Sequence, residues 1–177
     1  TIDDVVDVIR DEGEHQFMGA AGLSEDEDMF APVLTSTRRR ALWLGINLLT
    51  ALLASWVIGH FEATIQQIVA LAVLMPIVAS MGGIAGSQTL SLAIRGLALG
   101  QISNSNTRLL VLKELAVWVL NGVIWALVVA VIAGLWFSSQ QLALLIGVAM
   151  IINMAFAALS GALLPILLDR INIDPAL

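Results

Sequence analysis

The stretch MPIVASMGGIAGSQT, residues 75–89, places a proline, three glycines and a Gln-Thr pair inside a long apolar segment. It lies within an uncharged run over residues 63–94, which is longer than the ~20 residues that a helix needs to cross ~30 Å of hydrocarbon. A helix of this length is expected to be tilted, broken or extended beyond the bilayer. The run therefore predicts a membrane-spanning helix with an irregular interior.

Three further uncharged runs have the length of a membrane span, over residues 41–59, 115–139 and 142–168. The 177 residues are 59% hydrophobic and 12% charged, and their mean hydropathy is +0.93. Soluble domains rarely have this composition. We predict an all-α polytopic membrane bundle with four transmembrane helices. Without cysteine the chain has no disulfides or thiolate metal sites.

The basic residues lie at one end of each predicted span, at positions 10, 38–40, 95, 108, 113 and 170. The positive-inside rule then places both ends of the chain and a loop over residues 95–113 in the cytoplasm. Glu62 is the only acid assigned to the outside. It is either a solvated loop acid or a side chain that concentrates cations at an outer mouth.

The N-terminal segment is acidic, since ten of the fourteen acidic residues lie in the first 28. Helical spacing puts Ile2, Val5, Val6 and Ile9 on one face. The opposite face has an acidic stripe of Asp3, Asp4, Asp7, Asp11 and Glu14. The stripe is either a solvated helix face or a surface for a divalent cation that relieves carboxylate repulsion. We assign residues 1–37 to a cytoplasmic helix and linker, and 38–177 to a transmembrane transport domain.

The predicted spans hold neutral polar residues and no charged residue deep within any run, which argues against a proton relay. Most of these polar side chains, including Asn121 and Asn153, are expected to bridge helices. The glycines of the second span fit two interpretations, a helix-packing motif or the lining of a narrow wet path, and the residues leave both open. No nucleophile or hydrolase constellation indicates an enzyme.

Several motifs in this order resemble the MgtE family of magnesium channels and transporters. They are TIDDVVDVIRDE (1–12), INLLT (46–50), IGHFEATI (58–65), PIVASMGGIAGSQT (76–89), IRGLALG (94–100), LKEL (112–115) and GALLPILLDRINIDPAL (161–177). The first is similar to the helix that joins the family's cytoplasmic CBS-type sensor domain to its membrane domain. One departure is Ile84, which stands where the family usually has asparagine.

The resemblance implies a homodimer of five-helix subunits in the lipid bilayer of a bacterial inner membrane, with Mg²⁺ passing down its gradient through a pore on the dimer axis. The pore is lined by the second helix and by a fifth helix, which is expected beyond these residues. The implied pore-side residues are Pro76, Gly82, Gly83, Ala85, Gly86 and Gln88. We expect neither Gly83 nor Gly86 to tolerate a bulky side chain.

The resemblance also implies that cytoplasmic Mg²⁺ closes the pore by binding carboxylates of the sensor, the joining helix and the membrane domain. In this chain the matching regulatory ligands are Asp4, Asp7, Glu12 and Asp174. Mg²⁺ is then both the transported and the regulatory ion, with Co²⁺ or Zn²⁺ as related cargo, and no nucleic acid is involved. Two alternatives remain: an exchanger coupled to H⁺ or Na⁺, and a membrane assembly or sensor protein that binds dications without flux.

Overall fold

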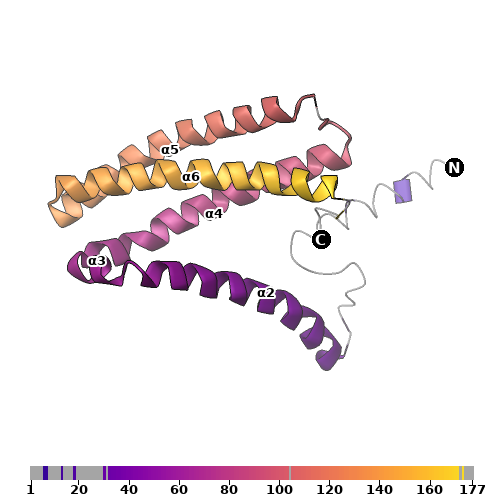
Figure 1. The fold of residues 1–177 in the computed structure, drawn as a ribbon, viewed down its shortest axis with the longest axis horizontal. Helices are drawn as coiled ribbons and strands as arrows, with labels where there is room; N and C mark the ends of the chain where they lie inside the picture. The colour runs from indigo at the N-terminus through magenta and orange to yellow at the C-terminus, as the bar shows by residue number, and fades with distance from the viewer. Residues whose placement is uncertain are drawn as a thin grey trace. The chain divides into compact units, whose positions relative to one another are not determined.

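The computed structural model describes Val6, Asp7, Gly13, Met18, Phe30 and residues 32–103, 105–171 and 173, apart from the side chain of Arg39. The described elements are α2 (Val33–Gly59), α3 (Glu62–Gln67), α4 (Val69–Ala98), α5 (Thr107–Phe137) and α6 (Gln140–Arg170), shown in Figure 1. All of them are helical, and no strand occurs in this part of the chain. The all-α prediction is confirmed.

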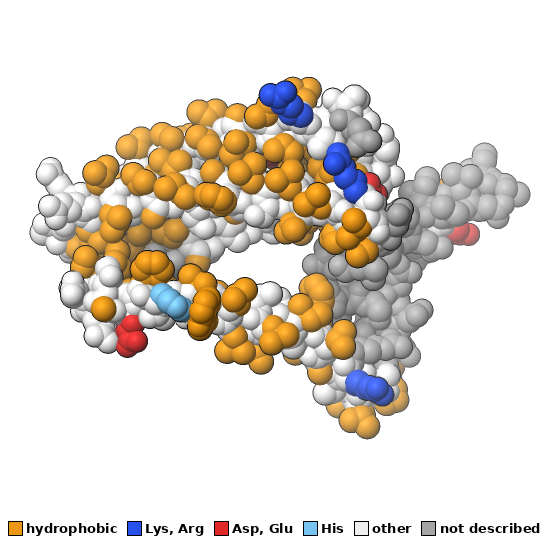
Figure 2. All heavy atoms as spheres, in the orientation of Figure 1, with side chains coloured by type: hydrophobic (Ala, Val, Ile, Leu, Met, Phe, Trp, Pro, Cys, Tyr) orange, Lys and Arg blue, Asp and Glu red, His pale blue; other side chains and the backbone are white. Residues whose placement is uncertain are grey.

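Four of these helices, α2, α4, α5 and α6, are long and apolar enough to cross a membrane. Hydrophobic side chains cover much of the visible face of α5 and α6 (Figure 2). Leu127, Leu135 and Leu144 are each exposed by more than half, which fits a surface in contact with lipid rather than water. The predicted membrane bundle is confirmed, and the chain is an integral membrane protein.

The chain divides into two units, residues 1–64 with 176–177, and residues 65–175. The first unit contains α2, which begins directly after Pro32. The Pro32 carbonyl accepts hydrogen bonds from the backbone N–H groups of Thr35 (2.9 Å) and Ser36 (3.2 Å). Pro32 is the residue before the first helical turn, and its φ of −54° and ψ of 137° are an extended conformation that proline favours. The helix starts earlier than predicted, so that the three arginines at 38–40 lie within it.

The long run over residues 63–94 is broken near its start. Ile68 has φ −127° and ψ 76°, outside the helical region, and separates α3 from α4. Pro76 lies inside α4 without ending it. Since proline has no backbone N–H, the carbonyl one turn earlier lacks its usual helical partner. A short helix before the spanning one therefore takes up the first part of the run, and α4 itself is 30 residues long.

In the second unit, α6 packs along both α4 and α5, whereas α4 and α5 make few contacts with each other. Figure 1 shows α6 between the other two helices. A Cβ built on Gly122 of α5 would lie 3.3 Å from the Ile151 Cα of α6. One on Gly147 of α6 would lie 3.6 Å from the Ala126 carbonyl oxygen. Small residues thus bring the backbones together, which is how helices associate when lipid replaces water.

The loop between α4 and α5 is shorter than predicted. The structure gives helix up to Ala98 and again from Thr107. Arg95, Arg108 and Lys113, all assigned to the loop from sequence, therefore lie on the helices. The expected loop was too long because basic residues were taken to mark the ends of the spans, although a spanning helix commonly extends past the hydrocarbon.

Candidate functional site

One face of α4 packs against α6. Gly82, Ala85, Thr89, Ala93 and Gly96 are buried on it. A Cβ built on Gly161 of α6 would lie 2.5 Å from the Gly86 carbonyl oxygen, so the two backbones are nearly in contact there. We call this buried surface the α6 face. Its small residues serve helix packing.

The Asn153 side chain of α6 lies across the α6 face. Its Nδ2 donates to the Val78 carbonyl oxygen at 2.6 Å. Gly82 leaves the space for this amide, because any Cβ at that position would overlap it. Asn153 therefore bridges two helices, as expected from the sequence, whereas Asn121 donates to the Val117 carbonyl of its own helix at 2.9 Å.

On the side of α4 opposite the α6 face, a stripe of small exposed residues runs from residue 76 to residue 91, with Val73, Ile77, Ile84 and Leu92 exposed around it. We call it the serine face; its members are Pro76, Ser80, Gly83, Ser87 and Ser91. At about 100° per residue these positions fall within an arc of about 80°. A membrane helix whose exposed stripe is small and polar, rather than leucine-rich, is suited to a protein or water contact more than to lipid.

Two of the three hydroxyl groups of the serine face, those of Ser87 and Ser91, donate their protons to their own helix. Ser87 Oγ donates to the Ile84 carbonyl at 3.1 Å, and Ser91 Oγ donates to the Ser87 carbonyl at 2.9 Å. With the proton directed inward, the lone pairs of each oxygen are left as acceptors on the exposed side. The serine face is therefore a row of hydrogen-bond acceptors.

An open pocket of about 330 Å³ lies at one end of the serine face. It is lined by Ser87, Gln88, Ser91, Leu92 and Arg95. Arg95 is the only charged residue among these, and no described carboxylate lines the pocket. Neutral oxygens alone offset only part of the cost of dehydrating a dication. A dication that entered this pocket would have to keep its water shell, and the positive charge of Arg95 does not attract it.

The predicted pore-side residues separate onto the two faces. Pro76, Gly83 and Gln88 are exposed, and a Cβ on Gly83 would have no neighbour within 4 Å. Gly82 and Ala85 are buried on the α6 face, and Gly86 is half-buried, with its Cβ position 3.5 Å from the Ala157 carbonyl oxygen. The expected close approach at Gly86 is thus found within the chain, and that at Gly83 has no described partner.

Of the predicted regulatory carboxylates, only Asp7 is described, and its side chain is exposed. Asp4, Glu12 and Asp174 lie outside the described residues. Within the described part of the chain no group of three His, Asp or Glu side chains is placed to hold a metal ion. Glu62, the outer-mouth candidate, is exposed in the first turn of α3. The roles of these residues stay predictions.

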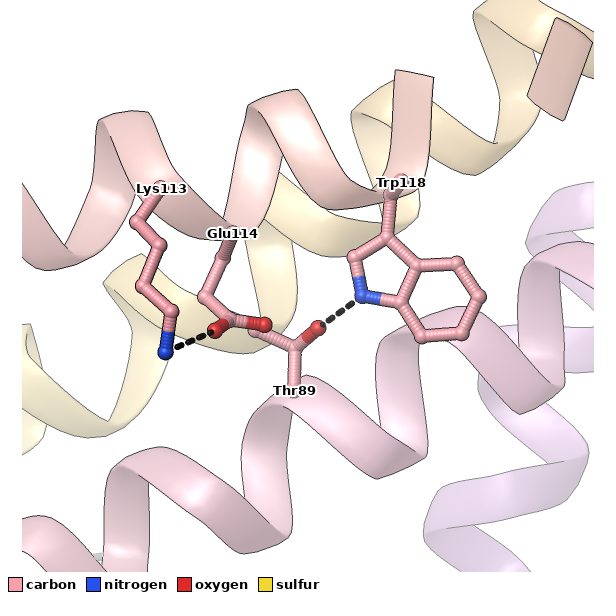
Figure 3. A network of polar contacts seen from close by, with 4 residues as sticks. All are labelled: Thr89, Lys113, Glu114 and Trp118. Atoms are coloured by element: carbon pink, nitrogen blue, oxygen red, sulfur yellow. Dashed lines mark hydrogen bonds and ion pairs between the residues drawn. The ribbon is translucent and has the colours of Figure 1, made fainter. Parts of the chain in front are cut away.

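Sequence reasoning missed Glu114, which is only 7% exposed although it lies on a membrane-spanning helix. Its carboxylate points toward Thr89 of α4 (Figure 3). An oxygen of Glu114 lies 3.8 Å from Lys113 Nζ. One turn further along α5, Trp118 Nε1 donates to Thr89 Oγ1 at 2.7 Å and links the two helices.

A signal for Glu114 was present in the spacing. Glu114, Trp118, Gly122 and Ala126 follow one another at four-residue intervals, which places them along one side of a helix. Gly122 and Ala126 pack against α6. The predicted loop ends at residue 113 and the predicted span begins at residue 115, so Glu114 fell between them and was given no place on the packed side of a helix.

Comparison with known proteins finds a family whose sequence model matches this chain and three named relatives. The sequence model of the MgtE family, described as a divalent cation transporter, matches residues 75–177. Relatives named "Magnesium transporter MgtE" are 32% identical over 176 residues in Enterococcus faecalis, 27% over 177 in Bacillus subtilis and 32% over 180 in Thermus thermophilus. These alignments cover 99–100% of this chain and 39–40% of each relative. The chain spans about two fifths of the length of the relatives that it matches.

Proposed function

The chain belongs to the MgtE family of divalent cation transporters, and we propose that its helices form part of a passive, channel-like path for Mg²⁺. The relatives from E. faecalis and T. thermophilus, both named magnesium transporters, support Mg²⁺ as the cargo. The observation that carries the proposal is the serine face of α4, an exposed stripe of small residues and acceptor oxygens on a spanning helix.

The chemistry of this face suits a hydrated ion. Mg²⁺ dehydrates reluctantly and keeps several waters when proteins bind it. Metal-bound waters are strong donors, and the inward-pointing hydroxyl protons of Ser87 and Ser91 leave oxygens free to accept from them. Pro76 and Gly83 project little side chain, which leaves room for the water shell. The face would therefore guide the ion through its waters rather than by direct ligation.

A second copy of the chain would complete this path. An acceptor row facing hydrocarbon is unfavourable, because polar groups without partners in lipid are costly. If the serine faces of two copies line a common axis, both faces meet a water-filled space instead of lipid. We therefore propose a homodimer with α4 beside the axis. A carboxylate that offsets the dication's charge would come from residues beyond those lining the pocket, as the family resemblance implies for a fifth helix.

We further propose that cytoplasmic Mg²⁺ closes the path. The support is the acidic N-terminal segment, with ten acids in 28 residues, together with the family resemblance. Clustered carboxylates repel one another, and a bound dication relieves that repulsion. Asp4, Asp7, Glu12 and Asp174 are the proposed ligands, facing a CBS-type sensor domain. In this scheme the segment lies on the cytoplasmic side of a bacterial inner membrane.

The test is Mg²⁺ influx into proteoliposomes that contain the full-length protein or its variants. Ser87→Leu removes an acceptor and fills the serine face, so we expect influx to fall by at least about tenfold, equivalent to ~1.4 kcal/mol on the barrier. Ser160→Leu is the matched control, since Ser160 is an exposed hydroxyl on α6. It should conduct like the parent.

Three outcomes would contradict the proposal. Equal flux in the Ser87 and Ser160 variants would show that α4 does not line the path. Dication binding without any flux in the parent would indicate an assembly or sensor protein. Influx that requires a proton or Na⁺ gradient would indicate an exchanger.

The exchanger is a second candidate because Glu114 is a buried, titratable group on a spanning helix, the kind of residue that relays protons in transporters. Under that mechanism Glu114→Gln would abolish the dependence of flux on a pH gradient. Under the channel mechanism flux shows no such dependence in either protein. The same liposomes with an imposed pH difference separate the two.

A further inference from the structure

The loop after α4 folds back on the end of that helix. Gly100 has φ +63°, a left-handed conformation that glycine adopts without strain. The Gly96 carbonyl accepts hydrogen bonds from the backbone N–H groups of Gln101 at 2.8 Å and Ile102 at 3.2 Å. These bonds satisfy a helix-terminal carbonyl and fix the direction in which the chain leaves α4.

Two side chains hold the loop in place. Ile102 packs over Gly96, where a Cβ would lie 2.8 Å from the Ile102 Cδ1. Asn106 donates through Nδ2 to the Gln101 carbonyl at 2.7 Å and accepts through Oδ1 from the Ser103 N–H at 2.8 Å. The loop is therefore tied to both helices that it joins.

The loop closes one side of a pocket of about 420 Å³ between α4 and α5, which we call the loop pocket. Its polar lining is Arg95, Gln101, Asn106 and Lys113, and its apolar lining includes Leu92, Ile102, Leu109 and Leu110. The pocket is thus amphipathic, with two basic residues contributed by different helices.

The positive charge of the loop pocket is only weakly offset. Within the described residues, no carboxylate lies within 4.0 Å of Arg95. The Lys113 side chain is 66% exposed, and its Nζ is 3.8 Å from Glu114, a distance and exposure at which an ion pair stabilises little. Both cations are therefore available to an anionic ligand.

The position of the pocket along the helices indicates which chemical class of anionic ligand it suits. It lies at the end of two spanning helices, where Figure 2 shows basic side chains next to a hydrophobic surface. Leu92 is 47% and Leu109 71% exposed, so they meet the surrounding medium. Charged and amide groups at the level of lipid headgroups, continued by leucines toward the hydrocarbon, match the two parts of a phospholipid.

We propose that the loop pocket binds an anionic phospholipid. Arg95 and Lys113 contact its phosphate, Gln101 donates from its amide, and an acyl chain lies along Leu92 and Leu109. Free phosphate would leave these leucines without a partner. The proposal requires that α4 and α5 span the membrane, and it holds whether or not the protein conducts Mg²⁺.

The test is native mass spectrometry of the full-length protein in detergent, titrated with phosphatidylglycerol or with phosphatidylcholine of the same acyl chains. We expect the parent to bind phosphatidylglycerol more tightly. Arg95→Gln and Lys113→Gln should each weaken that binding by roughly fivefold, from the typical contribution of one basic residue at a lipid surface. Arg95→Lys, which keeps the charge, should retain most of it.

Arg108→Gln is the matched control. Arg108 lies on the first turn of α5, is exposed and does not line the pocket. An equal loss in this variant would show diffuse surface attraction and overturn the proposal, as would equal binding of the two lipids by the parent. Carbodiimide coupling of the Lys113 amine to an acidic residue before position 30, with no lipid bound, would assign the pocket to the chain's own acidic segment. Unchanged thermal midpoints in phosphatidylcholine exclude misfolding of the variants.

Discussion

Both faces of α4 contain small residues, but one face packs against α6 and the other is exposed. On the side that packs against α6, Gly86 lies against the α6 backbone, and Gly82 leaves space for Asn153, which bridges the two helices. On the serine face, Gly83 has open space beside it, and the Ser87 and Ser91 hydroxyls donate to carbonyls of their own helix. The difference shows that a glycine in a membrane helix acquires its role from what it faces, not from its identity.

The largest expected effect is on stability and should be confined to the α6 face. Gly161→Ala places a methyl group against the Gly86 carbonyl and the Leu90 N–H, backbone atoms that cannot turn aside. We expect it to destabilise the protein by about 1–3 kcal/mol, the usual range for overpacking. Gly83→Ala should be neutral or slightly stabilising, because alanine is favoured over glycine within a helix. Unfolding in detergent micelles measures both. Similar losses in the two variants would show that something also packs on the serine face.

For Mg²⁺ influx we expect the larger effect on the serine face rather than on the α6 face. Gly83→Leu fills the serine face without touching α6, so we expect Mg²⁺ influx to fall by about tenfold, or ~1.4 kcal/mol on the barrier, with the unfolding midpoint unchanged. Liposome flux and detergent unfolding on the same preparation measure the two effects. Normal flux in a stable Gly83→Leu protein would remove the serine face from the path.

Sequence alone predicted the helices well but could not separate these faces. Gly82 and Gly83 are neighbours in one motif, and both were assigned to the pore side. They differ by about 100° around the helix, and only the position of α6 decides which one is buried. The break at Ile68 also has no strong local signal, since Ile68 is an apolar residue within an apolar run.

Glu114 shows the same limit for charged residues. A hydropathy profile places the end of a span at a carboxylate. Whether that carboxylate is buried depends on which helix packs over it. Asn153 was predicted to bridge helices and does so. Thr89 was expected to bridge on the same grounds, but its partner, Trp118 on α5, could not be read from a sequence pattern because the contact joins helices that otherwise meet little.

Removing the hydrogen bond between Trp118 and Thr89 should have a smaller effect on stability. Thr89→Val and Trp118→Phe should each cost about 0.5–1.5 kcal/mol, the net value of one hydrogen bond. The double variant should cost less than the two single losses together, because both substitutions remove the same bond. Unfolding of the four proteins of this double-mutant cycle in detergent gives the coupling. Strict additivity would mean that the bond does not stabilise the protein.

The smallest expected effect concerns Ile84, which is 46% exposed beside the serine face and which the sequence comparison of motifs singled out as a departure from an expected asparagine. Ser87 Oγ already donates to the Ile84 carbonyl, so a polar side chain at position 84 would lie one turn from that hydroxyl. Ile84→Asn adds an amide oxygen that accepts from the waters of a passing ion. A single neutral hydrogen bond contributes about 0.5–1.5 kcal/mol, and only the part present at the barrier raises the rate. We therefore expect Mg²⁺ influx to rise by no more than about threefold.

Ile124→Asn is the control, since Ile124 is 58% exposed on α5 and its replacement puts the same amide on an apolar surface. Faster flux in both variants, or in neither, would show that position 84 is not beside the ion.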